Sequence, residues 1–386
     1  MTLHILSEYK DINYIYQNTP VFPGKIYYHP KYLEAAASAE LHAIPLLLWW
    51  KVLANEINPL WPRVEVSAIY AVLVKSVPIT LTKDFSRKIY IDMETPYGYG
   101  GPIFFMNGGY IDYGDSDIEN EFFEAFYSEF NEWAKKTDFV AEFIRFNPLT
   151  NNQKLIPDHY DISLNRKTVC IDTSKSFDEI LSSATSARRR NYKKARNLGL
   201  TVKWYSLQHN LALETFKTLY EQTMTRLNAD AYYHFSSKYY NLLAEIDSTP
   251  QKSLIFKPDS GNIAIAYYEG MAIASVIFLQ DYLSIHYHLS CADDAYKDLQ
   301  PTAFIIFEAL RQASEIGYPR LHLGGGLSLA PDDQLFNYKK GFAPNSIKDF
   351  YIGKRIIKPR IYSKISQNWQ RITGKKPTIL LHYHNI

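Results

Sequence analysis

The sequence predicts an α/β protein (α+β, mixed sheet) that is built from two lobes. Its 386 residues exceed a single domain of about 150 residues. Apolar stripes at helical spacing alternate with short strand-like runs along most of the chain. A polar, turn-rich stretch over residues 149–167 indicates a connector between two regions of this mixture. We therefore expect an N-terminal lobe over residues 1–165, a C-terminal lobe over 166–352 and a basic segment over 353–386.

The first lobe shows its clearest elements just before the connector. Ser116-Asp117-Ile118-Glu119 matches a capping box, which satisfies free backbone amides at a helix start. Aromatic residues follow at helical spacing up to about Lys136. Phe139–Phe146 then has the composition of a strand, and Asn147-Pro148 ends it. Both element types are therefore expected in this lobe.

The second lobe is more regular. A second capping box, Ser176-Phe177-Asp178-Glu179, opens a predicted helix that ends at Gly199, a residue type typical of helix C-termini. Two further helices are expected, one carrying Phe216 to Leu227 and one beginning near Ser236. Strands are expected at residues 169–171, 200–204, 253–256, 262–268, 271–279, 282–290, 320–323 and 350–352, with a helix at 301–316. This order predicts a mixed sheet with helices on its faces.

Composition limits the class of protein. With 46% hydrophobic and 21% charged residues, the chain is expected to fold over most of its length. The net charge of +2 gives no overall attraction for a polyanion. Cys170 and Cys291 lie far apart and show no metal or disulfide spacing, as in a reducing compartment. The first residues lack the pattern of a signal peptide, and the most apolar run is too short to span a bilayer. A cytoplasmic protein is expected, and peripheral contact with the inner face of the membrane stays open.

Two basic clusters interrupt this balance. Residues 188–196 carry six cations and no acid on a predicted helix, and residues 354–386 carry eight Lys or Arg and no acid. The first cluster is either a solvated helix end or a contact for phosphate, on a nucleotide-linked substrate, a lipid diphosphate or tRNA. The second is either a solubilising tail or a surface for nucleic acid or an anionic membrane.

Glycines, lysines and histidines near the C-terminus form the next group. Gly324-Gly325-Gly326 follows a strand but lacks the lysine of a phosphate loop, so we interpret it as a close approach of backbone to backbone or ligand. Lys339 and Lys340 precede Gly-Phe, and an ammonium there can stabilise a developing oxyanion or lie on a surface turn. His286 and His288 share a strand face, but no third ligand has helpful spacing, so no metal is expected.

Thr95-Pro96-Tyr97-Gly98-Tyr99-Gly100-Gly101-Pro102 stands out in the first lobe. It follows a strand-like run but lacks the lysine and the helix of a phosphate loop. Its glycines indicate a bend against other backbone or a ligand, and its two tyrosines can line a binding site. A purely structural turn is the alternative.

Taken in order, these motifs resemble a known family. With Arg145-Phe146-Asn147-Pro148-Leu149, Thr223–Ala229 and His288-Leu289-Ser290, they resemble the FemAB-like branch of the GNAT acyltransferase superfamily over roughly residues 90–342. That branch includes peptidoglycan-bridge aminoacyltransferases and enzymes of surface-polysaccharide synthesis. The resemblance implies two tandem GNAT-like lobes with a substrate cleft between them, and a C-terminal segment that packs on the first lobe.

The resemblance also implies an activity. It implies an EC 2.3 acyltransferase that moves an acyl or aminoacyl group from acyl-CoA or aminoacyl-tRNA to an amine of a cell-envelope precursor, without a metal. Lys339 is expected to polarise the carbonyl, and His288 to serve structure or proton relay. Substrate contacts are expected from Tyr97, Tyr99, Arg189, Arg226, Lys340, Gly324 and Gly325.

Two departures keep the donor open. Residues 296–302 lack the glycines of the usual coenzyme A loop, and no long helical hairpin for tRNA is visible. The alternatives are an acyl-CoA-dependent N-acyltransferase acting on a small amine or amino acid, a nucleic-acid-binding protein, and a non-catalytic scaffold.

Overall fold

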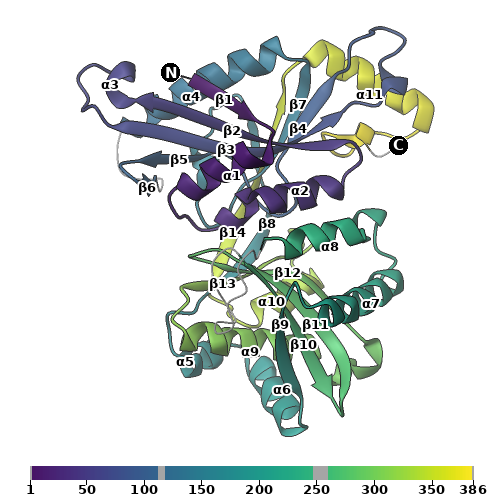
Figure 1. Ribbon diagram of the computed structural model, residues 1–386. Helices are drawn as coiled ribbons and strands as arrows, with labels where there is room; N and C mark the ends of the chain where they lie inside the picture. The colour runs from purple at the N-terminus through teal and green to yellow at the C-terminus, as the bar shows by residue number, and fades with distance from the viewer. Residues whose placement is uncertain (1, 112–117, 247–259, 385–386) are drawn as a thin grey trace. The chain divides into compact units, whose positions relative to one another are not determined.

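The computed structural model describes residues 2–111, 118–246 and 260–384, which form two compact units (Figure 1). Unit 1 comprises Met1–Val21, Ala36–Leu164 and Tyr351–Ile386. Unit 2 comprises Phe22–Ala35 and Asn165–Phe350. Both combine a sheet with helices, so the predicted mixed α/β class is confirmed.

Unit 1 is built on a sheet of order β1-β2-β3-β4-β7-β14, with β5 and β6 continuing from β3. Its pairs are antiparallel except for the parallel pair β4–β7. The strands are β1 (Thr2–Leu6), β2 (Ala43–Leu53), β3 (Glu65–Ser76), β4 (Ile91–Glu94), β5 (Ile103–Met106), β6 (Gly109–Tyr110), β7 (Phe139–Arg145) and β14 (Ile347–Ile356). The helices are α1 (Tyr9–Asn18), α3 (Ala54–Ile57), α4 (Ile118–Lys136) and α11 (Pro359–Thr373), together with the end of α2 (Pro30–Ser38), whose residues up to Ala35 belong to unit 2.

Aromatic packing holds α4 on the sheet of unit 1. Phe122, Phe126 and Phe130 recur at helical spacing and are fully buried. Phe126 meets Trp50 of β2 edge to face, with ring centroids 5.9 Å apart. This confirms the predicted helix and the strand after it, whereas the predicted capping box at Ser116 lies outside the described residues. In the C-terminal segment, Ile365 and Trp369 of α11 pack with strand β7.

Unit 2 has a sheet of order β8-β13-β12-β11-β10-β9, whose one parallel pair in the described residues is β12–β13. The strands are β8 (Asp161–Asp172), β9 (Thr201–Ser206), β10 (Ser260–Tyr268), β11 (Met271–Gln280), β12 (Ile285–Ala292) and β13 (Arg320–Gly325). The helices are α5 (Phe177–Ser183), α6 (Ser186–Asn197), α7 (Asn210–Arg226), α8 (Ser237–Ala244), α9 (Pro301–Glu315) and α10 (Gln334–Lys340). The almost wholly apolar inner face of α9 packs on this sheet.

Three predictions for unit 2 need correction. The helix expected up to Gly199 is two helices, because Thr185 caps a new start by accepting the Arg188 amide. The expected connector over 149–167 already contains the beginning of β8, at Asp161. Lys339 and Lys340 are the last two residues of helix α10 and do not lie on a surface turn. The predicted strand at 253–256 lies outside the described residues.

Phe22–Ala35 joins unit 2, which no sequence pattern indicated. The Gly24 amide donates to the buried carboxylate of Asp281 over 2.9 Å. The ring of Tyr27 meets that of His286 edge to face at 4.9 Å. Lys31 pairs with Glu245 at 2.8 Å. Each of these contacts links residues more than 200 positions apart, which local pattern cannot reveal.

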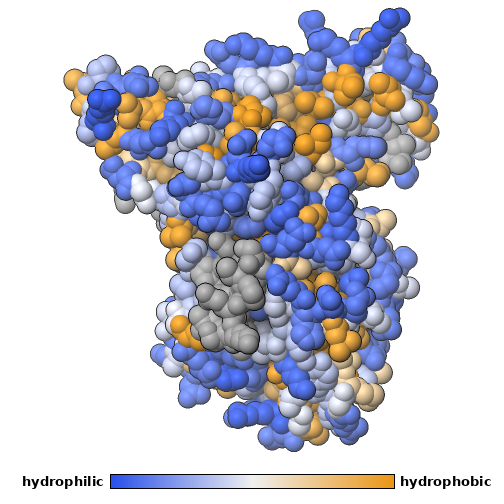
Figure 2. Space-filling model, in the orientation of Figure 1, coloured by the Kyte–Doolittle hydropathy of each residue, from blue (hydrophilic) through white to orange (hydrophobic). Residues whose placement is uncertain are grey.

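The surface residues differ in hydropathy. On the face seen in Figure 2, hydrophilic residues predominate and hydrophobic residues stand singly or in small groups. Within the described residues, no helix has both the length and the apolar character needed to cross a membrane.

Candidate active site

The site in unit 2 begins where two parallel strands separate. β12 and β13 pair at Ile285–Leu321 and His286–His322, and no further pairing between them is recorded in the described residues. Beyond those pairs β12 follows β11 and β13 follows β8. In open α/β sheets, ligands bind outside the carboxyl ends of parallel strands, where the topology changes. The end of β13 there is formed by Gly324 and Gly325.

Close backbone packing explains part of the glycine run. A side chain on Gly325 would lie 2.7 Å from the Lys167 carbonyl oxygen, and one on Gly326 would collide with the Asp333 carboxylate. That carboxylate accepts the amides of Leu327 and Ser328 and also caps α10 by accepting the Phe336 amide. Asp333 therefore ties the loop after β13 to the helix that carries the two predicted lysines.

Lys339 is held inside this arrangement. Its side chain is buried, and Nζ donates to the Gly325 carbonyl oxygen over 2.8 Å. Nζ also lies 5.4 Å from the centre of the Tyr287 ring on β12. Burial, with a smaller contribution from the charge of Arg166, lowers the Lys339 pKa to about 8. Near neutral pH the ammonium form still predominates, next to the end of the β12–β13 pair.

Three histidines lie on the same two strands, β12 and β13. The rings of His286 and His322 meet edge to face with centroids 5.7 Å apart, and His286 Nε2 lies 3.4 Å from the Asp281 carboxylate. His288 is the extra residue of a β-bulge opposite Ile277–Phe278, and its Nε2 lies 2.6 Å from the Tyr239 hydroxyl. Burial, then the charge of His286, lowers the His288 pKa to about 3. His288 is therefore a neutral imidazole with a fixed partner.

The other predicted cations of unit 2 lie apart from this cluster or have protein partners. Arg189 donates to the carbonyl oxygens of Ser182 and Ala184 at the end of α5. Arg226 pairs with Asp294 at 3.4 Å. Lys340 is half-buried beside Lys339 on α10. Their roles toward a substrate remain predictions.

Arg188 connects several helices of unit 2. The sequence pattern did not distinguish it from the other cations of the basic cluster. It donates to the Gln300 side chain over 3.1 Å and to the Tyr338 carbonyl oxygen over 3.3 Å. Its guanidinium also lies 4.1 Å from the centre of the Tyr338 ring. It thus joins α6, the start of α9 and α10. Of the six clustered cations, Arg190, Lys193, Lys194 and Arg196 are exposed.

Unit 1 contains the Thr95–Pro102 loop, which is anchored at both ends. Thr95 Oγ1 accepts the Arg145 amide over 2.8 Å, and the Gly100 amide donates to the Arg145 carbonyl oxygen over 2.7 Å. The Asn152 side chain then donates to the carbonyl oxygens of Gly100 and Pro102. Tyr97 and Tyr99 lie between these anchors and are half-buried. These hydrogen bonds hold the loop in place. A fixed loop is what a binding role for the two phenols requires.

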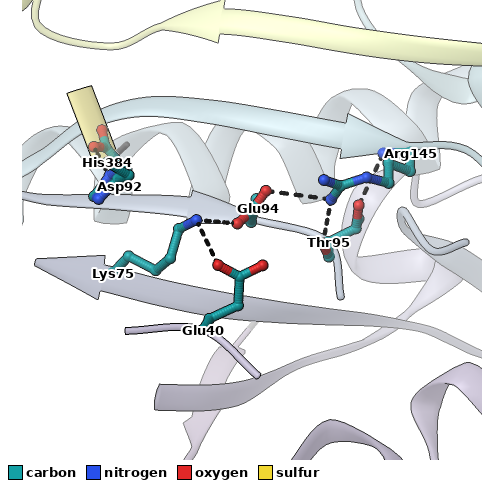
Figure 3. Close-up of polar contacts among 7 residues, drawn as sticks. All are labelled: Glu40, Lys75, Asp92, Glu94, Thr95, Arg145 and His384. Atoms are coloured by element: carbon teal, nitrogen blue, oxygen red, sulfur yellow. Dashed lines mark hydrogen bonds and ion pairs between the residues drawn. The ribbon is translucent and has the colours of Figure 1, made fainter. Parts of the chain in front are cut away.

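A charged network supports that loop (Figure 3). The Lys75 ammonium lies between Glu94, with which it pairs closely, and Glu40, 3.3 Å away. Arg145 pairs with Glu94 at 3.2 Å and donates to the Thr95 carbonyl oxygen over 2.9 Å. Burial would raise the Glu94 pKa, but Arg145 and Lys75 outweigh it and lower that pKa below its usual range. Sequence reasoning missed this network, because its members lie on β3, β4, β7 and the loop after α2.

Comparisons with known proteins concern the fold and one domain of this chain. Residues 186–340 match a family described as an acetyltransferase (GNAT) domain. No curated protein matches the chain. The solved structure of FemX is similar over 94% of this chain and 99% of its own, with 13% identity and a TM-score of 0.59. A conserved protein of unknown function from Bacteroides thetaiotaomicron VPI-5482 is similar over 92% and 100%, with 11% identity and a TM-score of 0.53. Both likenesses concern the fold, and the site described in unit 2 lies largely within the matched domain.

Proposed function

We propose that this chain, an acyltransferase of the FemAB-like branch of the GNAT superfamily, transfers an acyl or aminoacyl group to an amine of a cell-envelope precursor. The acceptor class follows from the resemblance to peptidoglycan-bridge aminoacyltransferases and surface-polysaccharide enzymes. The observation that carries the mechanism is the buried Lys339, fixed on Gly325 where β12 and β13 separate.

The reaction is aminolysis of an activated ester. The acceptor nitrogen attacks the carbonyl carbon of a thioester or of an ester to tRNA, which gives a tetrahedral oxyanion. The carbon–sulfur or carbon–oxygen bond then breaks, the amide forms, and the thiol or hydroxyl leaves with a proton from the former amine. A charged donor in a dry site lowers the energy of the oxyanion, since it needs no reorganisation as the charge develops. Lys339 supplies such a donor.

The acceptor amine has to lose a proton before it attacks, since a free lysine amine has a pKa of about 10.4. His288 is neutral and its bond to the Tyr239 hydroxyl orients the ring, but its low pKa makes it too weak a base to be the main proton acceptor. We assign His288 a structural or relay role on this ground. Much of the rate can also arise from positioning alone.

The remaining predicted residues are proposed as substrate contacts. Tyr97 and Tyr99 are proposed to orient the acceptor, because their loop is pinned at both ends. Arg189, Arg226 and Lys340 are proposed to meet anionic groups. Gly324 and Gly325 are proposed to let the donor approach the backbone at the end of β13.

The donor is proposed to be acyl-CoA or aminoacyl-tRNA. Helix α9 begins after Gln300, which has the left-handed φ of 52° where coenzyme A enzymes commonly place glycine. The Gln300 side chain accepts from Arg188, so a cation adjoins the N-terminus of this helix. This arrangement is compatible with a phosphate of either donor.

A ligand panel followed by turnover tests the proposal. Thermal unfolding with acetyl-CoA, longer acyl-CoAs, UDP-linked sugars and muramyl peptides identifies the ligands, since each bound ligand raises apparent stability. Amide formation is then measured with the ligands that bind, for the unchanged protein and for Lys339→Met. An acceptor that gains no acyl group from any bound acyl-CoA would reject acyl-CoA as the donor, and an equal rate in the variant would reject the role assigned to Lys339.

A further inference from the structure

Unit 1 has a pocket of about 550 Å³ outside the residues that match the acetyltransferase domain. Its walls include Asn131 and Lys135 of α4, His159 just before β8, Asp161 as the first residue of β8, and Arg355 of β14. The first four residues of β8, up to Leu164, belong to unit 1. Pockets that bind small molecules commonly measure about 300–1,000 Å³, so this one has room for a molecule of nucleotide size. None of the residues assigned to acyl transfer lines it.

Positive charge dominates the polar side of the pocket. Lys135, Lys354 and Arg355 line it, against the single carboxylate of Asp161. Asp161 lies 4.0 Å from Lys354 and is largely exposed, so their pairing is weak. Within the described part of the chain, neither Lys135 Nζ nor the His159 ring has a hydrogen-bond or ion-pair partner.

Arg355 is fixed from behind. Its Nε lies 3.1 Å from the fully buried carboxylate of Glu142, and Nη1 donates to Asn131. Glu142 also accepts the hydroxyls of Tyr70 and Tyr160, over 2.9 and 2.8 Å. The guanidinium is thus held rigidly at the pocket wall, which lowers the entropy cost of recognising an oxyanion.

The lining also contains apolar residues. Ile356, Ile357 and Leu380 contribute aliphatic side chains to it. A ligand with one anionic end and an uncharged body therefore matches both parts of the lining. Clustered cations favour a multiply charged oxyanion over a single carboxylate.

We propose that this pocket binds a phosphorylated small molecule, with its phosphate at Lys135, Lys354 and Arg355 and its uncharged part on Ile356, Ile357 and Leu380. The phosphate group is common to soluble nucleotides and to lipid headgroups. The site is separate from the proposed transfer chemistry, so binding here does not depend on it.

Calorimetric titration tests the proposal with inorganic pyrophosphate and UDP, and vesicle sedimentation tests the lipid source with phosphatidylglycerol against phosphatidylcholine. Lys135→Gln and Lys354→Gln are each expected to weaken binding about tenfold. Lys136→Gln is the matched control, because Lys136 neighbours Lys135 on α4, is exposed and pairs with Glu132 outside the pocket. Arg355 stays unchanged, because its loss would leave Glu142 buried without its cation.

A second readout follows the His159 ring by NMR. Burial, then the charges of Arg355 and Lys135, lowers the pKa of His159. Bound phosphate is expected to raise that pKa and to shift the ring signals, which are assigned with His159→Gln. Binding of either the soluble or the vesicle probe with loss in both pocket variants supports the site. No binding to any probe, or equal weakening by Lys136→Gln, would overturn it.

Discussion

Lys339 Nζ and the Gly325 carbonyl oxygen form a 2.8 Å hydrogen bond that joins the end of α10 to the end of β13. Because burial lowers the Lys339 pKa to about 8, its ammonium is expected to be lost as the pH rises past about 8. We predict that kcat/KM falls over this range and that Lys339→Met lowers kcat by about 10²-fold or more. Lys175→Met, which removes an exposed lysine of the same unit, is the control. A pH–rate profile of Lys339→Met equal to that of the unchanged protein would remove Lys339 from the mechanism.

Buried neutral histidines are predicted to make unit 2 sensitive to acid. Burial, then the charges of Lys31 and Lys25, lowers the His29 pKa to about 3 from the usual 6.5. His29 in the unfolded chain is therefore protonated below about pH 6.5, whereas His29 in the folded protein stays neutral down to about pH 3. Stability from this group is full above pH 6.5 and falls by about 1.4 kcal/mol for each unit below it.

Urea unfolding between pH 7.5 and 4.5 measures this slope. His29→Gln is expected to reduce the change of unfolding free energy with pH by the contribution of one histidine, roughly 1.4 kcal/mol per pH unit. His4→Gln, which changes an exposed histidine that stacks on Trp49, is the control. An unaltered slope in His29→Gln would contradict the assignment of a neutral buried ring.

The Thr95–Pro102 loop permits a matched glycine comparison. Gly101 has a φ of +92°, and a side chain there would lie 2.7 Å from Asn152 Nδ2. Gly108 has a φ of +77° with open space around it. Gly108→Ala is expected to cost about 1–2 kcal/mol from backbone strain alone. Gly101→Ala adds a clash with the side chain that anchors the loop, so its free energy of unfolding should fall further, by about 1–3 kcal/mol more. Equal losses in the two variants would mean that Asn152 yields without cost.

Local pattern carried much of the fold prediction. The capping box at Ser176 and the strands of unit 2 from Asn262 onward followed from residues close in sequence. Thr185 was overlooked as a cap because the basic residues after it continue a helical pattern. Lys339 was singled out from its position before Gly341-Phe342 and given its role by the resemblance, whereas its burial and its hydrogen bond to Gly325 required the fold.

The remaining features depend on contacts that no window of sequence contains. Phe22–Ala35 joins unit 2 through Asp281, which lies 257 positions from Gly24. Arg355 meets Glu142 because β14 returns to pair with β7. The sequence therefore predicted that the basic C-terminal segment lies on the surface, whereas its Arg355 forms a buried ion pair with Glu142. The predicted cleft between lobes stays a prediction.

Lys75 provides the sharpest test of the network beside the Thr95 loop. Its side chain and that of Glu94 are 9% and 6% exposed, and Glu40 lies on its other side. Lys75→Met would leave two carboxylates with the charge of Arg145 alone, so we predict a loss of about 3–5 kcal/mol in unfolding free energy. The exposed pair Lys51–Glu65 is the control, and Lys51→Met should cost at most about 1 kcal/mol. Adding Glu40→Gln to Lys75→Met removes one unpaired charge and is expected to restore part of the loss in the same urea titration. If the double variant is no more stable than Lys75→Met, the damage comes from lost packing of the lysine stem rather than from uncompensated charge.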